Sequence, residues 1–171
     1  LDCFTFQGGF ALHAARAGAS EVLGLDQSDE ALTQARANAS ANELKATFEQ
    51  ANVFDWLKKI SGKETREFDV VILDPPSFTR NRASVPDALR GYKEIHLRAL
   101  RMLPPGGLLA TFCCSHHVDD DLFLDTILSA AADARKVLRL RERFWQSPDH
   151  PVVPAIRETE YLKGFLLEVL P

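Results

Sequence analysis

The sequence predicts an α/β protein with a doubly wound, mostly parallel sheet, helices on both faces and an antiparallel pair of strands at the carboxyl-terminal edge. First, short apolar runs alternate with helical stretches along most of the chain, as in parallel sheets joined by crossover helices. Second, the run 68–73 is short and β-branched, as a buried strand should be, and Asp74-Pro75-Pro76 stops it. Third, no helix separates the last two strands, so we expect them to pair antiparallel.

Apolar periodicity divides the chain into elements in a regular order. The predicted strands cover 1–3, 21–26, 47–52, 68–73, 108–112, 137–145 and 160–170, and the predicted helices cover about 10–17, 28–42, 56–60, 86–103 and 120–134. The second helix is amphipathic, with Ala31, Leu32, Ala35 and Ala39 on its apolar face. Gly18 is placed to end the first helix, and Gly164 predicts a β-bulge in the last strand.

Length and composition indicate one globular domain over residues 1–171. Hydrophobic residues make up 46% of the chain and charged residues 26%, and neither a membrane-spanning run nor a signal peptide is present. Three cysteines, two of them adjacent, favour a reducing cytoplasm over a disulfide framework. A net charge of -4 argues against nucleic-acid binding by this domain alone. Because the chain opens on Leu1-Asp2-Cys3 without a methionine, we expect it to be the carboxyl-terminal domain of a longer protein.

Two carboxylates are predicted at the carboxyl ends of parallel strands, where open α/β sheets bind ligands. Asp74 follows the central strand, and Asp26 ends the second strand about twenty residues after the loop containing Gly8 and Gly9. That loop can bring backbone N–H groups to a ligand, or it can be an ordinary tight turn. Asp26 can accept hydrogen bonds from a ribose, or it can cap the following helix, a role for which Ser28 competes.

Asn52 and Val53 follow the third predicted strand. The Asn52 side chain could accept a hydrogen bond from the amino group of an adenine, and the Val53 backbone N–H could donate one to the ring. Alternatively, Asn52 could cap the next helix. Cys113 and Cys114 follow the strand over 108–112. Because successive side chains alternate across a strand, only one of them is expected to face the site, and the other to pack as a small apolar residue.

A basic run follows the central strand. It most often forms a solvated surface, although beside an active site it could contact phosphates. Its members are Arg80, Arg82, Arg90, Lys93, His96 and Arg98. His116, His117 and His150 are candidates for bases or phosphate contacts, and the spacing of histidines and cysteines predicts no metal site.

Several motifs together resemble one enzyme group across essentially the whole chain. The group comprises the class I S-adenosylmethionine-dependent methyltransferases that form 5-methylcytosine in bacterial 23S ribosomal RNA, which have a Rossmann-like, seven-stranded methyltransferase fold. The motifs are Leu1-Asp2-Cys3-Phe4-Thr5-Phe6-Gln7-Gly8-Gly9-Phe10, Asp26, Asp74-Pro75-Pro76-Ser77-Phe78, Arg90-Gly91-Tyr92-Lys93, Thr111-Phe112-Cys113-Cys114-Ser115 and Asp149-His150-Pro151. In that family an amino-terminal PUA-type RNA-binding domain and a small linking domain precede the catalytic domain.

The resemblance implies a site and its partners. S-adenosylmethionine is the implied cofactor and ribosomal RNA the implied substrate, with a homodimer as one assembly to test. Asp74 is expected beside the transferable methyl group, and Cys114 is expected to be the nucleophile. The implied cofactor-binding residues are Asp2, Phe4, Thr5, Gly8, Asp26, Gln27, Ser28, Asn52, Val53 and Asp74. Pro75-Pro76 stands where another branch of RNA cytosine methyltransferases has Pro-Cys, so a second, product-releasing cysteine is absent there.

Three other functions are weighed against this interpretation. Amino-group methyltransferases place an aromatic residue directly after Asp-Pro-Pro, whereas Ser77 precedes Phe78 here, and they need no Cys114. A nicotinamide dehydrogenase would carry the full G-x-G-x-x-G fingerprint, which this chain lacks. An inactive scaffold would keep the fold and bind only RNA or protein, and cofactor titration would identify it.

Overall fold

The computed structural model describes residues 1–62, 68–79 and 81–171. These residues form a seven-stranded sheet in the order β3-β2-β1-β4-β5-β7-β6. The strands are β1 (Asp2–Cys3), β2 (Leu23–Asp26), β3 (Thr47–Gln50), β4 (Val70–Leu73), β5 (Leu108–Cys113), β6 (Leu138–Trp145) and β7 (Lys163–Val169). The five strands β1 to β5 pair in parallel, while β7 pairs antiparallel with both β5 and β6. The predicted doubly wound sheet with an antiparallel edge is therefore confirmed.

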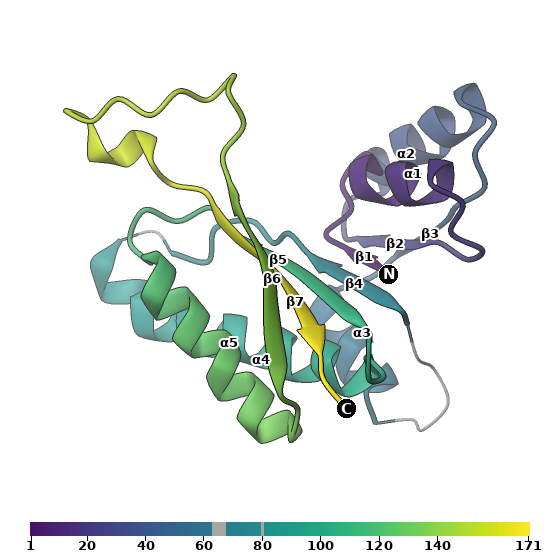
Figure 1. The fold of residues 1–171 in the computed structure, drawn as a ribbon. Helices are drawn as coiled ribbons and strands as arrows, with labels where there is room; N and C mark the ends of the chain where they lie inside the picture. The colour runs from purple at the N-terminus through teal and green to yellow at the C-terminus, as the bar shows by residue number, and fades with distance from the viewer. Residues whose placement is uncertain (63–67, 80) are drawn as a thin grey trace.

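Helices cover both faces of the sheet, each over its own apolar cluster (Figure 1). The helices are α1 (Gly9–Arg16), α2 (Asp29–Ala41), α3 (Val53–Ile60), α4 (Val85–Met102) and α5 (Asp120–Ala134). A small cluster joins α1, α2 and β3 through Ala11, Ala35 and Phe48. The larger cluster joins α3, α4 and α5 to the strands and contains fully buried Tyr92 and Phe123.

Helix starts differ most from the sequence-based expectation. The third helix begins at Val53, three residues earlier than predicted, because the Asn52 side chain accepts a hydrogen bond from the Asp55 N–H and caps the first turn. A 3₁₀ turn over Arg82–Ser84, which periodicity did not indicate, leads into α4. Gly18 has a φ of 92° directly after the first helix, as predicted for a glycine that ends it.

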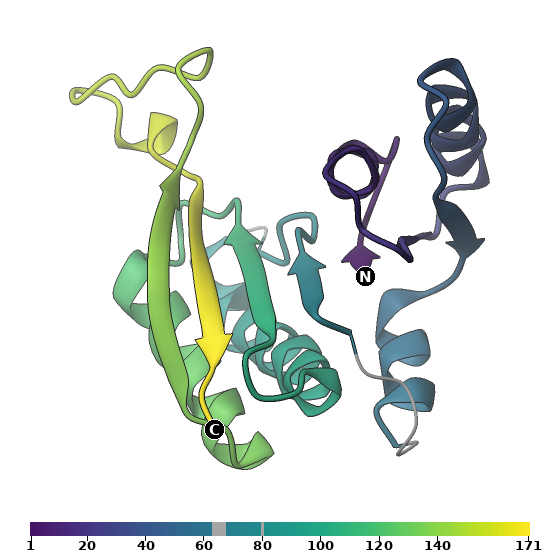
Figure 2. The same cartoon turned by 45° about the vertical axis from the view of Figure 1, so that its right-hand side comes forward.

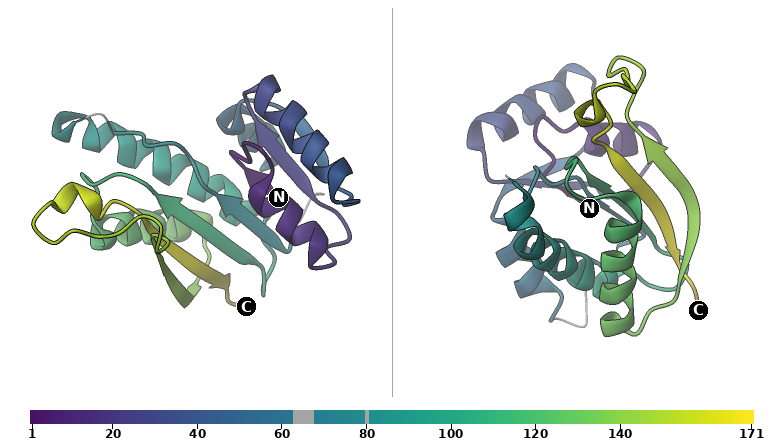
Figure 3. Two further views of the ribbon diagram at one scale, coloured as in Figure 1. Left: turned by 90° about the horizontal axis from the view of Figure 1, so that it is seen from above. Right: turned by 90° about the vertical axis from the view of Figure 1, so that its left-hand side faces the viewer.

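The antiparallel edge is regular at Gly164, so the predicted bulge there is wrong. Gly164 pairs with Phe112 on one side and with Phe144 on the other. The irregularity lies instead in β6, between Leu140 and Glu142. Figure 3 (right) shows β6 and β7 side by side along the outer border of the molecule.

The carboxyl ends of β4 and β5 lie next to each other. Leu73 pairs with Thr111, so Asp74 and the Cys113-Cys114 pair leave the sheet at the same edge. The arrowheads of both strands point toward that edge in Figure 2, where the long connection between β6 and β7 also projects. All three cysteines are free thiols. Within the described ranges, no helix combines the length and apolar character needed to cross a membrane.

Candidate functional site

A cavity of about 450 Å³ opens at the carboxyl ends of β1, β2 and β4. Its lining is largely apolar, with two carboxylates and two side-chain amides at its rim. Six predicted residues line it: Phe4, Asp26, Gln27, Asn52, Val53 and Asp74. Four further residues line it that were not assigned to cofactor binding: Phe6, Phe54, Pro76 and Phe78. Their signal was adjacency: Phe6, Phe54 and Pro76 stand within two residues of an assigned one, and Phe78 ends the Asp74-Pro75-Pro76-Ser77-Phe78 motif.

The loop after β1 is held from beneath by Asp2. The buried Asp2 carboxylate accepts hydrogen bonds from the Thr5 hydroxyl (2.5 Å) and the Ala11 N–H (3.0 Å). Burial raises the pKa of Asp2 to about 6. Asp2 and Thr5 were expected to bind the cofactor. Both are buried and neither lines this cavity, although Thr5 lines a second cavity along α1. Both residues fix the loop that lines the first cavity.

Gly8, another predicted cofactor-binding residue, shapes the same loop and does not line the cavity. Its φ of 86° is in the left-handed region, and an added Cβ would lie 3.1 Å from the Phe48 ring. Phe4 and Phe6 also have positive φ values, of 65° and 49°. This tight backbone turns the Phe6 N–H toward Asp26, which accepts it at 2.9 Å.

Asp26 is shaped to accept further hydrogen bonds from a ligand. Its second oxygen accepts from the Ser28 N–H at 2.9 Å, while the Ser28 hydroxyl itself caps α2 by accepting from Ala31. Ser28 is therefore the helix cap and does not line the cavity. A carboxylate has about four lone-pair positions, so two remain after these bonds, and Asp26 borders the cavity.

The Asn52 side chain also serves as a helix cap, while its residue borders the cavity. Val53 is the first residue of α3, and the first N–H groups of a helix have no partner within it. The backbone of Val53 thus offers a donor at the cavity wall, beside the half-buried Phe54 ring.

Asp74 and Cys114 are brought together by contacts between the loops that follow β4 and β5. The Cys114 thiol lies 3.9 Å from the Pro75 carbonyl oxygen. Ser115 is buried, and its hydroxyl is hydrogen-bonded to the Thr79 hydroxyl. Cys114 does not itself line the cavity, but it is partly exposed next to residues that do. Cys113 is fully buried, as expected for the one of the two cysteines that packs as a small apolar residue.

The electrostatics of this pair favour neutral forms. Burial raises the pKa of Asp74 and of the Cys114 thiol. The neighbouring Cys113 and Asp74 raise the pKa of Cys114 further, because two negative charges would repel, whereas the positive charge of Lys163 lowers it.

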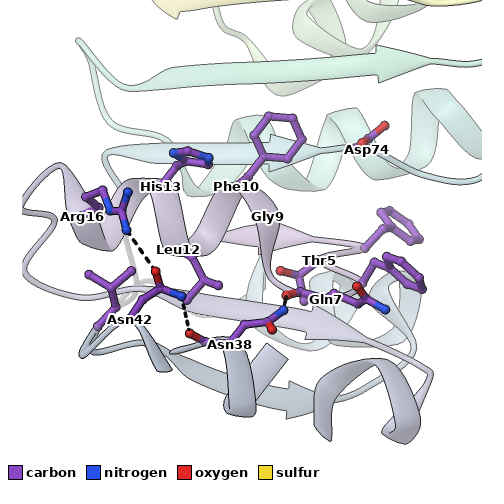
Figure 4. Close-up of a pocket in the computed structure, with 13 residues that line it drawn as sticks. Thr5, Gln7, Gly9, Phe10, Leu12, His13, Arg16, Asn38, Asn42 and Asp74 are labelled. Atoms are coloured by element: carbon purple, nitrogen blue, oxygen red, sulfur yellow. Dashed lines mark hydrogen bonds between the residues drawn. The ribbon is translucent and has the colours of Figure 1, made fainter. Parts of the chain in front are cut away.

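A second cavity, of about 590 Å³, lies along α1 and shares Phe4, Phe6 and Asp74 with the first. Figure 4 shows its polar side chains, with Arg16 donating to Asn42 at 3.0 Å. Asp74 therefore lies where the two cavities meet.

Four of the described members of the basic run have partners within the protein. His96 is fully buried between the Tyr92 carbonyl and the Thr111 hydroxyl, at 2.6 and 2.7 Å, and burial lowers its pKa to about 4. Arg90 pairs with Asp87, Lys93 with Asp133 and Arg98 with Glu94. Arg80 and residues 63–67, which are part of the polar loop that the sequence predicts over 61–67, lie outside the described residues.

The histidines are spread over two loops. His116 and His117 follow Cys114, with ring centroids 3.9 Å apart. On the β6–β7 connection, the His150 Nδ1 atom lies 3.2 Å from a carboxylate oxygen of Asp149. In the described part of the chain, no group of three or more histidine, cysteine or acidic side chains could hold a metal ion.

Known proteins resemble this chain in sequence and in fold. A family model described as "Methyltransferase domain" matches residues 1–150. The ribosomal RNA large subunit methyltransferase I of Vibrio parahaemolyticus is 44% identical over 175 residues, which are 99% of this chain and 44% of that protein. Its counterpart in Enterobacter sp. is 42% identical over 173 residues, 99% of this chain and 43% of that protein. The chain thus spans less than half the length of these relatives.

Two solved structures share the fold at low sequence identity. SMU.776, classed as a methyltransferase and solved with SAH, has a TM-score of 0.84 and 23% identity, over 98% of this chain and 44% of that one. NSun6 from Pyrococcus horikoshii, solved with SFG, has a TM-score of 0.73 and 16% identity, over 99% of this chain and 47% of that one.

Proposed function

The chain belongs to the methyltransferase-domain family, and from this premise we propose that it transfers a methyl group from S-adenosylmethionine to carbon 5 of a cytosine in 23S ribosomal RNA. The observation that carries the cytosine assignment is the partly exposed Cys114 thiol, 3.9 Å from the backbone of the loop that begins with Asp74. The relatives' name supports ribosomal RNA as the substrate.

The cavity at the strand ends fits S-adenosylmethionine. The two remaining acceptor positions of Asp26 suit the two ribose hydroxyls, and the Val53 N–H suits a ring nitrogen of adenine. Phe54 and Phe78 supply apolar surface for the flat base. Asp74, at the junction of the two cavities, would face the sulfonium end. When bound, the cofactor supplies an electrophilic methyl group.

Cys114 would make the cytosine reactive. Carbon 5 of cytosine is too weak a nucleophile to accept a methyl group unaided. The Cys114 thiolate would add to carbon 6 and make the electrons of the ring double bond available at carbon 5. Carbon 5 would then bond to the methyl group as the bond between that group and the cofactor sulfur breaks. Loss of the carbon-5 proton to a base restores the double bond and expels the Cys114 thiolate. The target base must leave its stack to reach this edge.

Asp74 would stabilise the charge that develops on the ring. Burial raises its pKa, which favours the protonated carboxyl group, and this group can share its proton with ring nitrogen 3 as electron density accumulates there. The same carboxyl group, once ionised, can accept from the cytosine amino group.

Transfer to an exocyclic amino group fits the structure less well. Such enzymes stack the target base on a free aromatic ring after Asp-Pro-Pro. Here Phe78 is packed between Phe54 and Tyr92, at ring-centroid distances of 5.7 and 4.6 Å. The Phe78 ring is thus occupied by these two rings and by the proposed cofactor cavity, which it lines. In such a reaction Cys114 would have no task.

Most affinity for RNA would come from sequence outside this chain. The net charge is -4, and the arginine and lysine side chains of α4 described above are paired with acids. Because the relatives are more than twice as long, we place the main RNA-binding region in their additional sequence, and we leave a homodimer as a hypothesis for that longer form.

The product nucleoside tests the proposal. Unmodified 23S ribosomal RNA is incubated with S-adenosylmethionine and the chain, alone and within any longer natural protein that carries it, and the digest is resolved by mass spectrometry. We expect 5-methylcytidine as the new nucleoside. A methyl group on an exocyclic amino nitrogen, with no 5-methylcytidine, would overturn the cytosine assignment while leaving the family unaffected.

A further inference from the structure

Lys163 is a buried lysine at the edge where Cys114 leaves the sheet. Only 7% of its surface is exposed, although lysine is almost never buried unless it is paired. It is the first residue of β7 and lies opposite Cys113 in the β5–β7 register. The side chain is therefore anchored one residue away from the proposed nucleophile.

The ammonium group of Lys163 holds the turn that follows Cys114. Its Nζ donates to the carbonyl oxygens of Ser115, at 2.6 Å, and Val118. The two hydrogen bonds link both ends of the turn over residues 115–118 to the same ammonium group. Among the described residues, Lys163 forms no salt bridge with a carboxylate, so no acid neutralises its charge.

The other ionisable groups that act on Cys114 are acids. Cys113 precedes it in the chain, Asp74 stands across the loop contact, and the buried Tyr92 hydroxyl lies beneath. Each of them would repel a thiolate when ionised. The ammonium group of Lys163 is bound at the carbonyl of Ser115, the residue directly after Cys114. A positive charge close to a thiol favours the thiolate, and the thiolate, not the thiol, is the nucleophile.

We propose that Lys163 is the positioning residue of the nucleophile: it fixes the 115–118 turn and supplies the positive charge that stabilises the Cys114 thiolate. The inference rests on the proposed function. Lys163 transfers no proton in this role: Cys114 loses its proton to solvent, and the bond between the Cys114 sulfur and carbon 6 then forms.

The test follows alkylation of Cys114 by iodoacetamide from pH 6 to 10, with the modified peptides quantified by mass spectrometry. Lys163→Gln keeps a hydrogen-bond donor but removes the charge, and Lys163→Arg keeps the charge. Lys136→Gln is the matched control, because Lys136 also donates to a backbone carbonyl, that of Leu103, at 3.1 Å. Fully buried Cys3 reports on the integrity of the fold.

We expect the pH midpoint of Cys114 alkylation to rise by about one unit or more in Lys163→Gln, which corresponds to roughly tenfold slower labelling below the midpoint. Lys163→Arg and Lys136→Gln should keep the parent midpoint. An unchanged midpoint in Lys163→Gln would overturn the inference. If Cys3 becomes reactive in Lys163→Gln, the fold of that variant is disturbed, and Lys163→Arg decides instead. A midpoint of Cys114 alkylation equal to that of the parent in Lys163→Arg supports the role of the charge, and a raised midpoint contradicts it. Because the assay contains neither RNA nor methyl donor, failure of the proposed function would leave its result intact.

Discussion

At the scale of single residues, Asp26 links the loop after β1 to the proposed ribose site. Its two carboxylate oxygens accept from the Phe6 and Ser28 N–H groups, which fixes the carboxylate plane beside the cavity. The same oxygens have acceptor positions left for a ligand. Binding of S-adenosylmethionine should therefore depend strongly on this side chain.

Asp26→Ala should weaken binding of S-adenosylmethionine by about 1–3 kcal/mol, the scale of hydrogen bonds to a charged group. Asp29→Ala is the control, because Asp29 begins α2 close by and its nearest cationic partner, Arg36, is 4.0 Å away. Isothermal titration calorimetry measures both. Equal affinities in the two variants would remove Asp26 from the cofactor site, and tight NAD binding without binding of the methyl donor would contradict the cofactor assignment.

Residues at strand ends were predictable because their chemistry and position are both visible in the sequence. Asp26 and Asp74 follow apolar runs, and alternation along the strand separated Cys113 from Cys114. Lys163 and His96 were not predictable as buried groups. Their burial depends on which strand or helix packs over them, and polar side chains at such positions usually face solvent.

At the scale of elements, an aromatic stack passes over β7 at a glycine and links α1, β5 and β6. The Phe112 ring stacks on Phe10 and on Phe144, at centroid distances of 5.5 and 5.6 Å. Both Phe112 and Phe144 pair with Gly164, whose missing Cβ leaves room for the Phe112 ring. This stack connects α1, β5 and β6 beside the site.

Gly164→Ala should lower the free energy of unfolding by about 1–3 kcal/mol, the usual cost of overpacking. The added Cβ would lie 2.6 Å from the Phe112 ring, and the stack limits how far that ring can move. Gly9→Ala should be neutral or stabilising, since nothing lies within 4 Å of its Cβ position and it begins a helix. Urea unfolding gives both values, and a Gly164→Ala protein as stable as the parent would contradict this account of the stack.

The order of the elements was predictable, but several of their boundaries were not. Long apolar runs set the strands, and the absence of a crossover helix set the antiparallel edge. The start of α3 depended on whether Asn52 capped a helix or faced a ligand, and the sequence allowed both. The function of Gly164 depended on two aromatic residues in different strands, Phe112 and Phe144, which no local pattern connects.

At the scale of the whole molecule, the sheet brings the proposed cofactor cavity and the proposed nucleophile to one edge. The cofactor cavity is built by the β1, β2 and β4 ends, and the thiol by the β5 end. Parallel pairing of β4 with β5 brings these parts together, and the antiparallel β7 places Lys163 beside them. Fold and site are therefore consequences of the same strand order.

The measurement that tests the central claim most directly is covalent trapping on RNA that carries 5-fluorocytosine at the target position. Fluorine cannot leave carbon 5 as a proton does, so methyl transfer should leave the enzyme bonded to carbon 6. We predict an RNA adduct that depends on S-adenosylmethionine, that mass spectrometry maps to Cys114, and that persists in Cys113→Ala but is lost in Cys114→Ala. An adduct mapped to Cys113, or no adduct with a parent protein that still methylates its RNA, would contradict the account.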